Sequence, residues 1–425
     1  MKLRKTGVLL VALAMAATGC RGGEEGGDGA ISAPGVTEEP CPDAVNEDNG
    51  CIYLGTISDL TQGPFAPLGV PITEAQEAFW QRVNEDGGIG GYDINVTEYV
   101  RDNLYNPETQ AQVYTEIEPE VLALAQTLGS PTTLAILEQM KSADVIGAPA
   151  SWTSLWGFED NILESGSSYC IDAMNGVDYF VENEGIESVM AVGFPGDFGG
   201  DSAAGAEIAA KANGIEFTNV ETAPGQEAQA GAVSAIVRQN PDLVILGTGP
   251  TETAVIVGQA AAQGYQGQFL GASPTWNPAL LESPAAPALE ALFRHVGPWG
   301  SFGTDTPGHQ AMRDALGDVD QPNDGYTSGW AWSYPLKAAL EEWLEGDYEG
   351  TRAGLIEAVQ ALETVDFEGM LPEEAGNRSG ENDLFRQSVI STVDQSEPAG
   401  LALEEDFFTG PTAEAAEIDG ACFEG

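Results

Sequence analysis

The sequence predicts an α/β protein with two lobes, each built on a doubly wound parallel sheet. Short apolar runs rich in β-branched residues alternate along the chain with longer segments of helical periodicity, which is typical of βαβ units. The chain has 425 residues, of which 42% are hydrophobic. This composition is sufficient for two cores, and the length favours two domains.

The order of the predicted elements follows from these patterns. Strands are expected at residues 51–57, 94–100, 144–147, 188–192, 215–218, 243–246 and 268–271. Helices are expected between them, at residues 71–85, 107–125, 132–142, 174–184, 202–212, 230–239 and 251–263. In parallel sheets ligands bind at the carboxyl ends of the strands, against helix N-termini, so we expect a site in the loops that leave the strands there.

The N-terminus is typical of an export signal. Three basic residues among the first five precede the apolar run 8–17, which is shorter than the ~20 residues of a membrane-spanning helix. Small residues then lead to Cys20, in a pattern that resembles the lipobox of bacterial lipoproteins. We predict a signal peptide at residues 1–19 and lipidation of Cys20. Ala17 stands where the lipobox prefers Leu, so a secretory signal without an anchor remains an alternative.

Residues 20–48 are predicted to form a flexible acidic tether, because this segment is rich in Gly and Glu and holds few large apolar residues. The protein is therefore expected on the extracellular face of the cell membrane or in the periplasm.

The other four cysteines are expected to form disulfides in this oxidising compartment. Cys41, Cys51, Cys170 and Cys422 allow three pairings, and the sequence does not choose among them. Closeness in the chain favours Cys41–Cys51, which leaves Cys170 with Cys422. No cysteine lies at metal-binding spacing and the chain has two histidines, so neither a metal site nor a cofactor is predicted.

The charge balance excludes some partners. The chain has 67 acidic and 15 basic residues, a formal net charge of −52. It therefore repels nucleic acids and anionic lipid surfaces. The acidic residues are spread along the sequence, so they must coat the folded surface, where salt would screen their repulsion. A saline or alkaline habitat is one hypothesis; a generic acidic exported protein is the other.

Several motifs together resemble the type I periplasmic-binding family that includes leucine/isoleucine/valine-binding proteins. In that family a strand is followed by a Thr-Gly loop, an amphipathic helix, a Gly-Gly-Ile-x-Gly turn and a second strand, in this order along the chain. The matching segments are 57–69, 74–80, 83–94, 102–109, 240–247 and 261–271. The resemblance covers about residues 51–395. It implies a monomeric receptor that closes two lobes around a small molecule and delivers it to an ABC permease.

The resemblance also implies three crossings between the lobes, near residues 168–171, 295–299 and 387–392. The lobes are then discontinuous. The N-lobe comprises residues 51–168 and 298–388, and the C-lobe comprises residues 172–296 and 389–425. A long helix at residues 327–344 falls in the N-lobe.

The first candidate ligand contact is Ser130, which opens a helix after an apolar stretch. Ser130 is predicted as the N-cap and Pro131 as the first helical residue, and the free amides of such a helix start favour negative charge. The family holds a ligand carboxylate or similar polar group with this loop, which implies Ser130 with Thr132 beside it. The alternative is that Ser130 only caps its helix.

Other candidates follow from the same resemblance. Ala150 and Ser151 match the family's contacts at a strand end, and Phe198 matches an aromatic residue that stacks on the ligand. Near Ser273 the family's acidic residue for an amino-acid ammonium is missing, and Trp276 is expected to fill part of the vacated space. A buried ammonium without a charged partner costs several kcal/mol, so the ligand need not be a branched-chain amino acid.

The predicted function is an extracellular receptor that captures a small polar molecule, such as an amino acid, an amide or a carboxylate, for import. A ligand sensor on the same fold that signals to a membrane kinase or chemoreceptor is the alternative. Enzyme activity is not expected. The glycine-rich segment 87–91 follows a helix and precedes a strand, the reverse of a dinucleotide-binding loop, and no nucleophile elbow or P-loop occurs.

Overall fold

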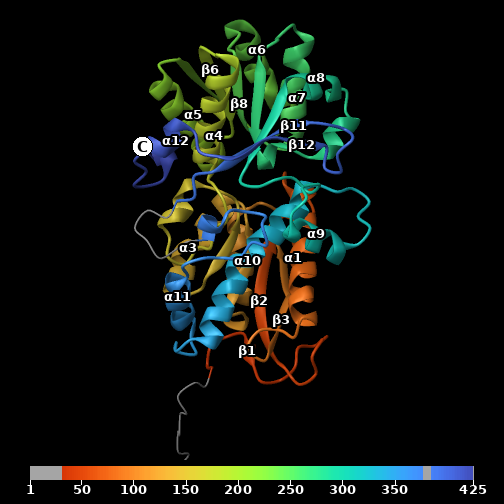
Figure 1. Cartoon of the computed structure of the whole chain (residues 1–425), viewed down its shortest axis with the longest axis vertical. Helices are drawn as coiled ribbons and strands as arrows, with labels where there is room; N and C mark the ends of the chain where they lie inside the picture. Colours follow the sequence, from red (N-terminus) through yellow and green to blue (C-terminus); the bar gives the residue numbers. More distant parts are fainter. Residues whose placement is uncertain (1–30, 377–383, 425) are drawn as a thin grey trace, which may run out of the picture. The chain divides into compact units, whose positions relative to one another are not determined.

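The computed structural model of the chain describes residues 31–376 and 384–424. The predicted signal peptide, the lipidation site Cys20 and residues 20–30 of the predicted tether lie outside this part. Two sheets with helices packed against them make up the described residues (Figure 1). No helix of the described residues is long and apolar enough to cross a membrane.

The first sheet holds the strands of the first lobe. Its members are β1 (Val36–Thr37), β2 (Gly50–Ser58), β3 (Tyr92–Asp102), β4 (Ala123–Leu128) and β5 (Gly147–Ala150). β2 pairs in parallel with β3 on one side and β4 on the other, and β5 continues the sheet in parallel beyond β4. The short β1 pairs with β2 in the antiparallel sense.

The predicted helix 107–125 is wrong in its second half. The helix α2 (Pro107–Ile117) is followed by a 3₁₀ turn at Glu118–Glu120 and then by the strand β4. Every residue of β4 is buried. A strand covered on both faces shows no polar alternation, and its Ala and Leu residues favour helices by intrinsic propensity, which explains the error.

The second sheet is mixed, whereas a parallel sheet was predicted. Its strand order is β12-β11-β10-β9-β8-β6-β7. The bounds are β6 (Ser188–Gly193), β7 (Glu216–Glu221), β8 (Leu243–Gly247), β9 (Gln268–Ala272), β10 (Phe293–Gly297), β11 (Ser388–Val393) and β12 (Leu401–Phe408). The strands β6 to β10 are parallel, and β11 and β12 extend them in the antiparallel sense.

Each sheet has its own helices (Figure 1). In the first lobe they are α1 (Ala66–Glu85), α2, α3 (Ser130–Ser142), α9 (Pro307–Leu316), α10 (Asp324–Glu345) and α11 (Arg352–Ala361). In the second lobe they are α4 (Tyr169–Glu184), α5 (Asp197–Asn213), α6 (Ala230–Gln239), α7 (Pro250–Ala262), α8 (Ala286–Leu292) and α12 (Pro411–Ala415). The predicted long helix corresponds to α10, which packs along α1.

The chain passes between elements of the two lobes before α4, after β10 and before β11. The residue limits given above for the lobes remain a prediction. Asp172 joins two of these connections: its Oδ1 accepts hydrogen bonds from the hydroxyls of Ser167 at 2.5 Å and Ser388 at 2.6 Å. The carboxyl is buried among neutral groups, and this burial raises its pKa to about 7.

Both predicted disulfides are confirmed. Cys41 is bonded to Cys51, and Cys170 at the start of α4 is bonded to Cys422 near the C-terminus. Residues 36–48, which were predicted to belong to a flexible tether, are held in the fold. The first disulfide and the β1 pairing fix residues 36–51, and the Asp93 carboxylate accepts further hydrogen bonds from this loop.

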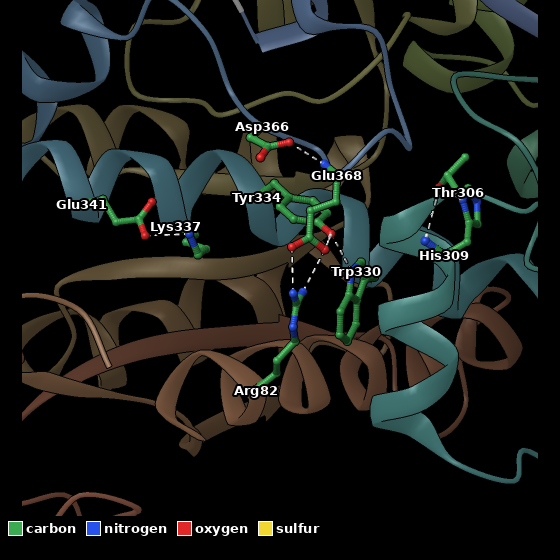
Figure 2. Close-up of polar contacts among 9 residues, drawn as sticks. All are labelled: Arg82, Thr306, His309, Trp330, Tyr334, Lys337, Glu341, Asp366 and Glu368. Atoms are coloured by element: carbon green, nitrogen blue, oxygen red, sulfur yellow. Dashed lines mark hydrogen bonds and ion pairs between the residues drawn. The ribbon is translucent and has the colours of Figure 1, made fainter. Parts of the chain in front are cut away.

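A half-buried ion pair connects the loop that carries Glu368 to the helix α1, as Figure 2 shows. Arg82 of α1 donates to both oxygens of Glu368, at 2.7 and 2.9 Å, and the Tyr334 hydroxyl of α10 donates to the same carboxylate at 2.8 Å. The Arg82 guanidinium holds the pKa of Glu368 below its usual range, and the hydrogen bond from Tyr334 lowers this pKa further. This network lies within the first lobe and supports the helices that carry the site.

Candidate ligand-binding site

A pocket lies between the two lobes, at the carboxyl ends of strands from both sheets. The empty space between its walls, including the opening to solvent, is about 560 Å³. Most of its walls are apolar or aromatic. The lining residues are Phe65, Leu68, Ile72, Tyr105, Leu128, Gly129, Ser130, Ala150, Ser151, Trp152, Tyr169, Phe198, Ser273, Pro274, Asp324, Gly325, Ser328 and Trp332.

Ser130 lines this pocket, but it is not the N-cap of its helix, as was predicted. The N-cap of α3 is Gly129, and Ser130 is the first helical residue, with no capping hydrogen bond from a side chain. Gly129 has φ 93°, and a Cβ there would lie 2.5 Å from the Tyr105 ring, so a side chain would be strained and would clash. Only glycine fits the turn that presents Ser130 to the pocket.

Thr132 is not among the lining residues. Its hydroxyl donates to the carbonyl oxygens of Leu128 and Gly129, the latter at 2.8 Å. The hydroxyl is therefore occupied in closing the first turn of α3. Thr132 contributes to the shape of the loop that carries Ser130.

The end of β5 contributes Ala150 and Ser151, both of which line the pocket. The Ser151 hydroxyl accepts a hydrogen bond from Trp156 Nε1 at 3.1 Å, so its orientation is fixed by a tryptophan in the core of the first lobe. Trp152 forms part of the wall, and its Nε1 donates to the Ser165 carbonyl at 3.1 Å. Its ring centroid lies 4.5 Å from that of Trp332.

From the second lobe, Phe198 and Ser273 line the pocket, as expected from their positions after β6 and β9. The Phe198 ring packs against Tyr169, with a centroid distance of 4.7 Å. Trp276 lies elsewhere. It stacks on Phe293 and donates from Nε1 to the Ala399 carbonyl at 3.0 Å, so it belongs to the core of the second lobe and does not fill the pocket.

The helix α10 also lines the pocket, with residues that were not predicted from the sequence. Asp324, Ser328 and Trp332 recur every fourth residue and line the pocket from one face of this helix. Asp324 is buried, and this burial raises its pKa to about 6. Its Oδ1 accepts one hydrogen bond, from the Phe302 amide at 3.2 Å. The spacing of four residues was visible in the sequence, but the sequence did not show that this face of α10 points towards the second lobe.

The sequence matches the family model described as "Periplasmic binding protein" over residues 52–394. The chain belongs to the periplasmic binding protein family. No curated protein matches the sequence.

Solved structures of periplasmic binding proteins resemble this one. A fatty acid ABC transporter substrate-binding protein from Thermomonospora curvata is 28% identical, with a TM-score of 0.83 over 92% of this chain and 98% of that chain. A branched chain amino acid ABC transporter from Thermus thermophilus with bound valine is 18% identical, with a TM-score of 0.71 over 86% of this chain and 98% of that chain. The second likeness shows the shared fold.

As a periplasmic binding protein, the chain binds a solute and is not an enzyme. One grouping of potential metal ligands in the described part of the chain consists of Cys170, Cys422 and Asp201, but its two sulfurs are joined in a disulfide. The Asp201 carboxylate instead accepts hydrogen bonds from the amide of Ser154, at 2.7 Å, and from its hydroxyl. This contact joins α5 of the second lobe to the segment after β5 in the first lobe.

Proposed function

We propose that this periplasmic binding protein is the solute-binding receptor of an ABC importer and that it closes its two lobes around one small organic molecule. The observation that carries the proposal is the composition of the pocket. Its walls come from α1, α3, β5 and α10 on one side and from α4, α5 and the end of β9 on the other. A ligand that touches both sides binds the closed arrangement better than the open one, and so shifts the equilibrium towards closure.

The wall chemistry supports a ligand with an apolar body and few polar groups. Five of the sequence-predicted residues, Ser130, Ala150, Ser151, Phe198 and Ser273, surround the same space. The three serine hydroxyls can hydrogen-bond a polar end of the ligand, and the rings of Trp152 and Phe198 can cover its apolar part. The relative from Thermomonospora curvata, by its name a fatty acid binder, agrees with the apolar character of the wall.

The partners and location follow as further parts of the proposal. The receptor is exported, anchored through Cys20 to the extracellular face of the membrane, monomeric, and recognised by an ABC permease in its closed form. The alternative, a ligand sensor, uses the same pocket and the same closure. It differs only in the membrane protein that recognises the closed form. Crosslinking of the closed receptor in native membranes to a permease rather than to a kinase or chemoreceptor distinguishes the two.

The test begins with protein purified without denaturation. Native mass spectrometry should show a mass increment from one bound small molecule, which is then released, identified and added back to stripped protein. Addition should restore the increment with the compound chemically unchanged. A compound that is converted during incubation would contradict the receptor assignment.

A further inference from the structure

The pocket contains one acidic side chain and no basic side chain among its lining residues. Asp324 lies at the first position of α10, where the positive end of the helix dipole favours a carboxylate. Among the described residues, this carboxylate accepts a single hydrogen bond, from the Phe302 amide. A buried carboxylate with so few partners is costly unless a cation or further donors complete its surroundings.

The second observation is an unpaired donor on the same face of α10. Trp332 is 2% exposed and lines the pocket, and its Nε1 has no hydrogen-bond partner among the described residues. Buried indole N–H groups normally have an acceptor. Asp324 and Trp332 are eight residues apart, which is ~12 Å along a helix axis. The pocket therefore offers an acceptor and a donor at two separate points along one wall.

We infer that Asp324 is the ligand anchor for a positively charged nitrogen, and that the ligand is an extended organic ammonium compound whose oxygen acceptor is bound by Trp332 Nε1. This inference rests on the proposed function and specifies the ligand class for the same pocket. It also supplies a charged partner from the first lobe, where the sequence near Ser273 in the second lobe has none.

The aromatic walls fit this ligand class. Trp152, Tyr169 and Trp332 form a cluster in which the Trp152 ring lies within 5.8 Å of the other two. Aromatic faces attract ammonium groups and pack against their alkyl substituents. An anionic ligand would instead meet the Asp324 carboxylate with no lysine, arginine or histidine in the wall to offset the repulsion.

The test uses three probes of equal chain length and different charge: hexyltrimethylammonium, hexanol and hexanoate. Isothermal titration should rank them in that order for the wild-type protein. Asp324→Asn preserves the shape and the acceptor for the Phe302 amide, and it should weaken hexyltrimethylammonium at least tenfold while changing hexanol less than threefold. Asp320→Asn is the matched control, because it removes an exposed charge near the start of α10 without touching the pocket, and it should change neither probe.

Trp332 is tested with a fourth probe, 6-(trimethylammonio)hexanoate, which adds an oxygen acceptor to the ammonium chain. Trp332→Phe should weaken this probe more than it weakens hexyltrimethylammonium. The inference is overturned if no ammonium probe binds, if hexanoate binds more tightly than hexyltrimethylammonium, or if Asp324→Asn leaves ammonium binding unchanged. An anionic compound that co-purifies and closes the lobes would overturn this inference and leave the proposed function intact.

Discussion

The Asp201 carboxylate holds Ser154 across the boundary between the lobes. Asp201 lies in α5 of the second lobe, and Ser154 begins the turn that follows β5 in the first lobe. The serine amide donates to Asp201 Oδ2 at 2.7 Å, and the serine hydroxyl donates to Oδ1. The Cys422 amide donates to the same hydroxyl oxygen at 2.8 Å, so the C-terminal segment takes part in this contact.

The first prediction concerns this contact and closure. Because Asp201 is one helical turn after Phe198, we expect the hydrogen bonds to favour the arrangement in which the pocket walls meet. Asp201→Asn removes the charge, and hydrogen bonds to charged groups contribute about 1.5–3 kcal/mol, so affinity should fall roughly tenfold. Titration with the co-purified compound measures the change.

Ser154→Ala is the partner variant, since it removes the hydroxyl bond and keeps the amide bond. In a double-mutant cycle, Asp201 and Ser154 should be coupled by 0.5 kcal/mol or more in the free energy of binding, a typical threshold for contacting residues. A loss of folding stability with unchanged affinity would mean that the contact persists when the lobes open.

The second prediction separates the roles of two neighbouring hydroxyls. Ser130→Ala should weaken binding roughly tenfold or more if the hydroxyl contacts a charged or strongly polar ligand group. It should lower the free energy of unfolding by less than the ~1 kcal/mol that is typical of a lost helix cap, because Ser130 is not a cap. Thr132→Val is the control with the opposite result, since its hydroxyl bonds the backbone. Titration and chemical denaturation of both variants check this.

The third prediction concerns the disulfides. In the chain-entropy model the stabilisation grows with the length of the closed loop. The Cys170–Cys422 bridge closes 252 residues and the Cys41–Cys51 bridge closes 10. Replacing Cys170 and Cys422 by serine should lower the free energy of unfolding by up to ~5 kcal/mol. Replacing Cys41 and Cys51 should lower it by up to ~3 kcal/mol. Equal losses in denaturant melts would show that loop length does not set the effect.

The fourth prediction is a pH dependence from Asp172. Its pKa is about 7 in the folded protein, against ~3.9 for an exposed aspartate, so the folded state binds the proton more tightly. The contribution of this group to stability is complete below pH ~4 and is lost as the pH rises through 7. From pH 5 to 7 the wild type should lose about 2 kcal/mol relative to Asp172→Asn.

This comparison with the variant is needed because other buried groups have the opposite effect. Burial lowers the pKa of His295 to about 3 and that of His309 to about 4, so both make the fold less stable on acidification. These contributions cancel when wild type and Asp172→Asn are compared at each pH. Parallel stability curves for the two proteins would refute the assignment to Asp172.

Much of the fold could be predicted because its signals are local. The strands β6, β8 and β9 combine apolar β-branched or aromatic residues with clear turn residues at their ends, and the sequence placed them correctly. β12 was missed because only its first residue is fully buried and its centre is the acidic run Glu404, Glu405 and Asp406, which reads as a solvated loop. The antiparallel edge of the second sheet therefore depends on pairing with β11, which the local pattern does not reveal.

The site was predictable where it follows single strand ends. Ser151 directly follows β5, and Ser130 and Phe198 lie at the starts of the helices that follow β4 and β6; all three line the pocket. Asp324 and Trp332 reach the same pocket only because the chain returns to the first lobe after β10. Their proximity to Ser130 depends on contacts between residues almost two hundred positions apart, for which a single sequence carries no periodic signal.

We expect one small molecule, bound without chemistry, to bring the two lobes together. Small-angle X-ray scattering of stripped protein, titrated with the compound recovered from native protein, tests it most directly. The radius of gyration should fall as the compound saturates the pocket, and Phe198→Ala should weaken both binding and the fall, because the ring is lost from the second-lobe wall. Saturation with no change in the radius of gyration would contradict the claim.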